Sequence, residues 1–215
     1  MGNVIWLDVM NDEESIYIGK FRQTKVLPAI AHKTIAILSE SNATREKLSD
    51  VSNISDTLFI TCSGHGTRDK VPAFNGLDLF NRFDSNLEEL VNEKIIHLHA
   101  CWTGKKLGGK IVEKGCKAFF GYDSLFSFPI EDDTDLFELF MEPDKNLIDE
   151  VVEGKKAFEV TDFVIHTYNK NLSIIHNHTS YGNYFGLMET NKQSFCSPTK
   201  NSKYGDPMAS LGEYV

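Results

Sequence analysis

Five apolar runs of strand length within the first 122 residues constrain the fold of this chain more than any other feature. Several of them are continuously apolar rather than alternating, which is typical of strands buried on both faces of a parallel sheet. Segments with helical periodicity separate the runs, so the order strand–helix–strand predicts an α/β protein with right-handed crossovers and helices on both faces of the sheet. The five runs cover residues 3–10, 34–38, 57–62, 95–100 and 116–122.

The rest of the chain divides into helical segments and a polar end. Helices are predicted over 42–48, 87–91 and 105–114, and two further helical patterns cover 135–141 and 157–168. The length of 215 residues, 41% of them hydrophobic, suits one domain with a proper core. We expect this domain to span residues 1–196. The last 40 or so residues predict short strands and loops, and residues 197–215 a flexible C-terminal tail.

Charge and hydropathy exclude several classes of partner. The formal net charge is -9, and no stripe of lysine and arginine interleaves with aromatic residues, which argues against nucleic acid. No apolar stretch approaches the ~20 residues that cross a bilayer, and residues 1–8 lack a basic leader with a cleavage site. We therefore expect a cytoplasmic protein that binds no membrane.

Two short motifs carry reactive side chains, and each follows one of the apolar runs. The first is Ser-Gly-His-Gly, residues 63–66, and the second is Ala-Cys-Trp-Thr-Gly, residues 100–104. The carboxyl ends of parallel strands share one edge of a sheet, so His65 and Cys101 are predicted to lie near each other. A cysteine at a helix N-terminus forms a thiolate readily, and an imidazole can act as its base. The N–H groups of Gly66 and Cys101 could then form an oxyanion hole.

This ordered pair of motifs resembles the caspase-like clan of cysteine peptidases, which includes caspases, metacaspases, legumains, clostripain-like enzymes and the CHAT peptidases. The resemblance covers roughly residues 1–170 and includes the segment "CKAFFGYDS" that follows the second motif. It implies a three-layer sandwich and an endopeptidase acting on a protein or peptide substrate. In that reading His65 is the general base, Cys101 is the nucleophile, and the main chains of Gly66 and Cys101 supply the oxyanion donors.

The resemblance also implies a specificity pocket, and here the chain departs from the clan. The residue two before the nucleophile lines this pocket and is Gln in caspases or an acid in metacaspases and legumains, whereas this chain has His99. Asp123, at the end of the next strand, is expected to share the pocket wall. A mixed histidine and carboxylate lining favours a neutral or polar substrate residue before the cut, and argues against strict Asp specificity.

The sequence gives two further expectations about the enzyme. It has no long cleavable insert after Cys101, so we expect control by a regulatory protein partner or a ligand rather than by processing into subunits. It identifies no third catalytic residue, and a main-chain carbonyl is one way of orienting His65.

Other chemistries fit the sequence less well. His97, His99 and Cys101 alternate along one strand, and His176 and His178 form a second pair, but neither group has a clear fourth ligand. The four cysteines form no C-x-x-C pair, so we expect no metal, cofactor or disulfide scaffold. Thr61 stands where a serine-hydrolase elbow around Ser63 needs glycine. The open alternative is a caspase-fold module that binds a partner without cutting it.

Overall fold

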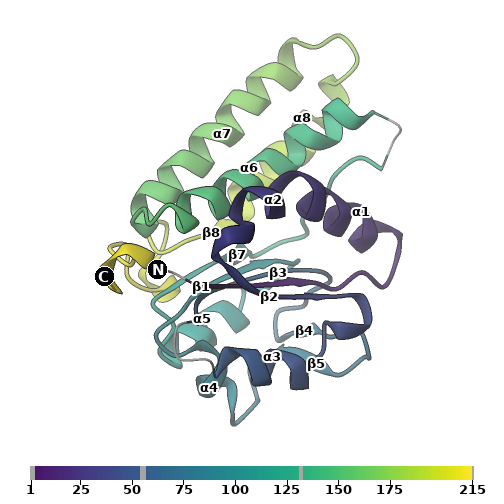
Figure 1. Ribbon diagram of the computed structural model, residues 1–215. Coiled ribbons are helices and arrows are strands. Elements are labelled where there is room, and N and C mark those ends of the chain that lie inside the picture. Colours follow the sequence, from purple (N-terminus) through teal and green to yellow (C-terminus); the bar gives the residue numbers. More distant parts are fainter. Residues whose placement is uncertain (1–2, 54–56, 131–132, 215) are drawn as a thin grey trace.

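The computed structural model describes residues 3–53, 57–130 and 133–214, and its centre is a six-stranded sheet (Figure 1). The strand order is β2-β1-β3-β6-β7-β8, and all neighbours are parallel except β7 and β8. The α/β class with a mainly parallel sheet is thus confirmed. The strands are β1 (Asn3–Asp8), β2 (Thr34–Ser39), β3 (Thr57–Ser63), β6 (Ile95–His99), β7 (Ala118–Tyr122) and β8 (Phe195–Cys196).

Helices cover both faces of the sheet, as expected (Figure 1). One face carries α1 (Glu13–Phe21), a π-helical turn (Arg22–Val26), α2 (Leu27–Ile30), α6 (Thr134–Val152), α7 (Ala157–Asn177) and α8 (Phe185–Ser194). The other face carries α3 (Arg45–Ser52), α4 (Leu87–Val91), α5 (Leu107–Glu113) and a hairpin of β4 (Lys70–Pro72) and β5 (Asp78–Asn81). These are the layers of a three-layer arrangement.

The continuous apolar runs follow from this layering. In β1, Trp6 packs into the core on the α6 face, while Ile5 and Leu7 pack into the core on the α5 face. All three side chains are fully buried. Successive side chains of a strand point to opposite faces, so a strand covered on both sides needs an apolar residue at nearly every position.

The C-terminal part differs from the sequence prediction. A helix, α8, occupies residues 185–194, where short strands and loops were expected. The expected flexible tail packs against the domain: Tyr204, Ala209 and Leu211 are buried, and the Ala157 N–H donates to the Ala209 carbonyl at 2.9 Å. Three buried apolar side chains spread over eight residues give too weak a periodic signal to be recognised in a polar stretch.

The two edges of the sheet are unlike. At one edge, β2 is six residues long, and its Ile35 and Ile37 side chains are 37% and 50% exposed. At the other edge, β8 has only two residues and runs antiparallel to β7.

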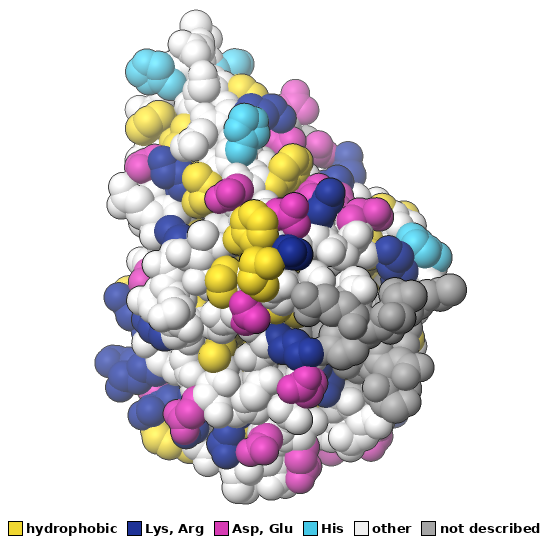
Figure 2. Space-filling model, turned by 90° about the vertical axis from the view of Figure 1, so that its left-hand side faces the viewer, with side chains coloured by type: hydrophobic (Ala, Val, Ile, Leu, Met, Phe, Trp, Pro, Cys, Tyr) yellow, Lys and Arg dark blue, Asp and Glu magenta, His cyan; other side chains and the backbone are white. Residues whose placement is uncertain are grey.

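The surface mixes charges of both signs. Figure 2 shows acidic and basic side chains interspersed over one face, with a small group of hydrophobic side chains near its middle. Among the helices of the described ranges, none is long and apolar enough to cross a membrane. Met1 and Gly2, which belong to the N-terminal stretch examined for a leader, lie outside the described residues.

Candidate active site

The two reactive motifs lie at the carboxyl ends of adjacent strands. His65 follows β3, Cys101 follows β6, and the two strands pair in parallel with Ser63 opposite His99. A Cβ added at Gly66 would lie 2.5 Å from the Cys101 carbonyl oxygen and 2.9 Å from the Ala100 Cβ. The loop after His65 therefore lies directly against the loop after β6, at a distance that only glycine allows.

Cys101 does not stand at a helix N-terminus, which corrects the sequence prediction. Residues 101–106 form turns, and α5 begins only at Leu107. Trp102 adopts a left-handed backbone (φ 63°), which bends the chain sharply just after the cysteine. The thiol consequently gains nothing from a helix dipole, and its reactivity depends on its other surroundings.

The Cys101 thiol is partly covered by the segment after β7, residues 123–128, which we call the covering segment. The Phe126 N–H donates to Cys101 Sγ at 3.3 Å, and the Trp102 N–H donates to the Ser124 carbonyl at 3.0 Å. Burial raises the pKa of the Cys101 thiol above its ordinary value, and the hydrogen bond from Phe126 only partly opposes this. In this arrangement the neutral thiol is favoured over the thiolate.

Phe126 also covers His99. Its side chain is 8% exposed, and its ring centroid lies 4.3 Å from that of His99 and 4.9 Å from that of Tyr122. His99 itself is 1% exposed. His99 therefore lies beneath the covering segment and does not line an open pocket.

His65 pairs with a residue that the sequence did not single out. Its Nε2 contacts Asp12 Oδ2, and the two side chains are 50% and 38% exposed. Asp12 is the N-cap of α1 and accepts from the Ser15 N–H at 3.0 Å. Burial acts to raise the pKa of Asp12, but the hydrogen bonds from Ser15 and the contact with His65 outweigh it and lower that pKa. A carboxylate at this place can hold the imidazole with Nδ1 left for the thiol.

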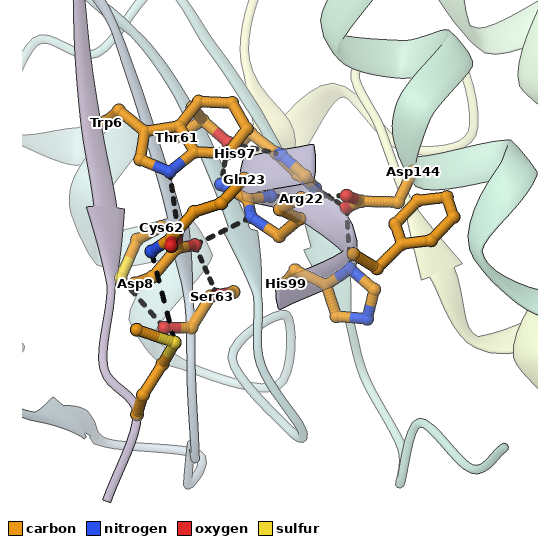
Figure 3. A network of polar contacts seen from close by, with 12 residues as sticks. Trp6, Asp8, Arg22, Gln23, Thr61, Cys62, Ser63, His97, His99 and Asp144 are labelled. Carbon is orange, nitrogen blue, oxygen red and sulfur yellow. Dashed lines mark hydrogen bonds and ion pairs between the residues drawn. The ribbon is translucent and has the colours of Figure 1, made fainter. Parts of the chain in front are cut away.

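His99 and His97 both face a buried carboxylate, that of Asp144 on α6. His99 Nδ1 lies 2.6 Å from Asp144 Oδ1, and His97 Nε2 lies 3.1 Å from the same oxygen (Figure 3). Burial acts to raise the pKa of Asp144, but His99, His97 and Arg22 together hold it well below its usual value. Burial also lowers the pKa of His97. The carboxylate that pairs with His99 is therefore that of Asp144, and not that of Asp123 as the sequence led us to expect.

The same network extends to the first strand through Arg22, which is fully buried at the start of the π-helical turn. Its Nε donates to Asp8 Oδ1 at 2.9 Å, and Nη1 donates to Asp144 Oδ2 at 3.2 Å. The guanidinium also lies over the Trp6 ring, 4.3 Å from its centroid. The guanidinium thus links two buried carboxylates, one on β1 and one on α6.

Two ring nitrogens of this network, His97 Nε2 and His99 Nε2, are buried without a well-formed hydrogen bond to a described residue, but His97 Nε2 still lies 3.1 Å from Asp144 Oδ1. His99 Nε2 is buried and makes no hydrogen bond to any described residue. Figure 3 shows this nitrogen pointing away from Asp144. A buried polar atom without a partner costs free energy, so its position calls for an explanation.

Helix α6 brings Asp144 to the network despite an internal proline. Pro143 has no N–H, so the carbonyl four residues earlier, that of Leu139, loses its helical partner. The Asn171 side chain on α7 replaces it, donating Nδ2–H to the Leu139 carbonyl at 2.8 Å. This contact satisfies the Leu139 carbonyl, which Pro143, the residue before Asp144, leaves without a helical partner.

Asp123 lies elsewhere. Its main-chain N–H donates to the Ser194 carbonyl at 2.9 Å. The negative charge of its carboxylate acts to raise the pKa values of Cys196, Lys200 and Tyr204. Asp123 therefore belongs to the β8 side of the sheet, and the structure does not pair it with His99.

The two main-chain N–H groups predicted as oxyanion donors are those of Gly66 and Cys101. Within the described ranges, neither the Gly66 N–H nor the Cys101 N–H donates to a main-chain carbonyl. Both groups follow strand ends at the same sheet edge.

The other cysteines are unlike Cys101. Cys62, Cys116 and Cys196 are buried, and burial raises the pKa of Cys62 to about 12 and that of Cys196 to about 11. Cys101 is the most accessible of the four thiols. No group of three or more His, Cys, Asp and Glu side chains suited to a metal ion occurs in the part of the chain that the structure describes.

One cavity lies beside Asp12, the partner of His65, and another lies beside the reactive loops. One, of about 720 Å³, lies between α1 and α6 and has Asp12, Tyr17 and Phe137 in its wall. The other, of about 600 Å³, is lined by residues that directly follow His65 and Cys101 in sequence.

Comparison with known proteins adds no relative: the chain matches no protein-family model and no curated protein.

Proposed function

We propose that this protein is a cysteine endopeptidase of the caspase-like clan that hydrolyses peptide bonds through Cys101 and His65. The observation that carries the proposal is the close packing of the two loops at the ends of β3 and β6, with Gly66 against the Cys101 carbonyl. The three-layer arrangement with helices on both sheet faces is consistent with a caspase-like sandwich.

The chemistry follows from these positions. His65 takes the proton from the Cys101 thiol, and Sγ attacks the substrate carbonyl carbon. The carbonyl oxygen becomes an oxyanion that accepts from the N–H groups of Gly66 and Cys101. As the C–N bond breaks, His65 returns the proton to the leaving amine and a thioester remains. Water, deprotonated by His65, then hydrolyses the thioester and restores the thiol.

Asp12 gives His65 the third group that the sequence could not identify. A carboxylate beside Nε2 fixes the tautomer in which Nε2 carries hydrogen and Nδ1 is free to accept the thiol proton. It also stabilises the imidazolium that forms during the attack. We assign Asp12 as a positioning residue because it acts through His65.

The covering segment supports control of the enzyme by a partner or ligand. With Phe126 over His99 and its N–H on Cys101 Sγ, this segment partly covers the thiol and obstructs the approach of a substrate. Movement would also uncover the unpaired His99 Nε2, which can then bind a polar group of the substrate residue before the cut. High activity of the purified chain on many unstructured proteins would contradict this proposal of control.

The alternative is a protein-binding module that does not cut, and the raised pKa of the covered Cys101 thiol favours it. A thiol-reactive peptide distinguishes the two. A peptidase is modified at Cys101 alone among the four cysteines, whereas a binding module is labelled slowly and without selectivity.

The direct test is mass spectrometry of products from a proteome-derived peptide library. We expect cleavage by the wild-type chain, none by Cys101→Ala, and nearly as large a loss in His65→Ala, because base and nucleophile act as one unit. Circular dichroism checks that both variants fold. Activity near the wild-type level in either variant contradicts the assignment.

A further inference from the structure

The cavity of about 600 Å³ beside the reactive loops has a cationic wall. Its residues come from the loop after His65 and from the loop after Cys101, and three of the six carry a positive charge. They are Gly66, Thr67, Arg68, Trp102, Lys105 and Lys106.

The two loops are joined, which fixes the cavity next to the reactive pair. The Leu107 N–H donates to the Arg68 carbonyl at 2.9 Å, and Gly66 packs against the Cys101 carbonyl. Both contacts involve the main chain, so they do not depend on the position of long flexible side chains. A group bound in this cavity lies within reach of the bond being cut.

The charges of this wall are not neutralised by ion pairs with the described residues. Arg68, Lys105 and Lys106 are exposed, and no ion pair joins any of them to a carboxylate of the described residues. The Lys105 Nζ instead lies over the Trp102 ring, 5.7 Å from its centroid. Three like charges around one cavity repel each other, and an anion bound among them relieves that repulsion. In a chain of net charge -9, this local excess of positive charge is unusual.

We propose that this cavity binds an acidic side chain of the peptide substrate, close to the scissile bond. The inference rests on the proposed peptidase function and assigns Arg68, Lys105 and Lys106 as specificity residues outside the pocket of His99. The Trp102 ring supplies an apolar wall for the methylene groups of a glutamate side chain, while the cations bind its carboxylate.

Binding is measured on the Cys101→Ala variant through tryptophan fluorescence, using hexaglutamate and hexaglutamine as probes. The chain has two tryptophans, and Trp6 is fully buried, so Trp102 is the one that a ligand can reach. We expect hexaglutamate to change the emission, hexaglutamine not to, and added salt to weaken the binding. The signal should disappear when Trp102→Phe is added.

Charge reversal then locates the site. Lys105→Glu with Lys106→Glu should weaken hexaglutamate binding by about tenfold or more. The control, Lys47→Glu with Lys155→Glu, makes the same change of net charge at exposed lysines away from the cavity and should alter binding by less than about twofold. An equal loss in both double variants contradicts the proposal. Inorganic phosphate binding as tightly as hexaglutamate would identify a small-anion site and also overturn it.

Cleavage is scored separately from binding. In the peptide library, we expect an acidic residue near the cut in wild-type products and a loss of that preference in Lys105→Glu with Lys106→Glu. Cleavage by wild type without any acidic preference refutes this inference and leaves the peptidase intact. Absence of cleavage and of selective Cys101 labelling refutes the peptidase itself.

Discussion

Phe126 is the side chain whose removal tests the covered state of the site most directly. It is 8% exposed, and its ring packs against His99 and Tyr122. Burial of a phenylalanine side chain contributes about 2 kcal/mol. If this contribution stabilises only the covered form, Phe126→Ala raises the equilibrium constant for opening by about 30-fold, because 1.36 kcal/mol corresponds to a factor of ten.

The assay is the rate of Cys101 alkylation by iodoacetamide, followed by peptide mass analysis. The covering segment limits access to the thiol, so the alkylation rate rises as the opening equilibrium shifts toward the open form. We expect Cys101 in Phe126→Ala to react several-fold faster than in wild type, with about 30-fold as the upper limit because the thiol is already partly exposed. Opening also removes the burial that raises the Cys101 pKa, so the reaction should reach its midpoint at a lower pH in the variant.

Two controls separate local opening from loss of stability. Leu125→Ala truncates the neighbouring side chain of the same segment, which is 54% exposed, and should leave the rate unchanged. Cys62 and Cys116 are buried in the core and report global unfolding. The covering role of Phe126 is refuted if Cys101 is alkylated no faster in Phe126→Ala than in Leu125→Ala. It is also refuted if the alkylation rates of Cys62 and Cys116 rise in parallel in Phe126→Ala.

Three further predictions concern the surrounding groups. Asp12→Ser keeps an N-cap for α1 but removes the carboxylate that contacts His65. We expect kcat to fall about tenfold with little change in Tm. An unchanged kcat excludes a positioning role for Asp12. Gly66→Ala forces a Cβ against the Cys101 carbonyl and should abolish library cleavage while circular dichroism stays native. Asp144→Asn should cost about 3 kcal/mol in urea unfolding, because a buried charge network loses one member. Because the folded state lowers the pKa of Asp144, the ionised carboxylate stabilises the fold at pH values above its unfolded pKa of about 3.9. This stabilisation is lost as the pH falls through the folded pKa, so the free energy of unfolding should depend less on acid pH in Asp144→Asn than in wild type.

The layers of the fold were predictable because burial on both faces leaves a strong signal. The five apolar runs match β1, β2, β3, β6 and β7 to within a few residues. The β4–β5 hairpin was missed because its strands have only three and four residues, and one of them contains Pro72. Short strands produce too little alternation to be separated from loops.

The site was less predictable, because its partners come from distant parts of the chain. Because each motif follows an apolar run, the sequence alone predicts that His65 and Cys101 follow neighbouring strands. Asp12 opens a capping box with Ser15, a signal that marks the start of α1 but not its contact with His65. Asp144 lies 45 residues from His99 and follows a proline within a helix, a position that gives no local sign of a buried carboxylate. Long-range pairing of this kind depends on how α6 packs on the sheet.

The unlike edges of the sheet limit how copies of this protein can associate. Open strand edges allow two sheets to join, and strand β2, with Ile35 and Ile37 exposed, is long enough to do so. The two residues of β8 offer almost no length for the same pairing at the opposite edge. Two copies joined antiparallel through β2 would therefore form one continuous sheet that ends in β8 at both sides. Such an assembly closes as a two-fold dimer and cannot grow into a fibre.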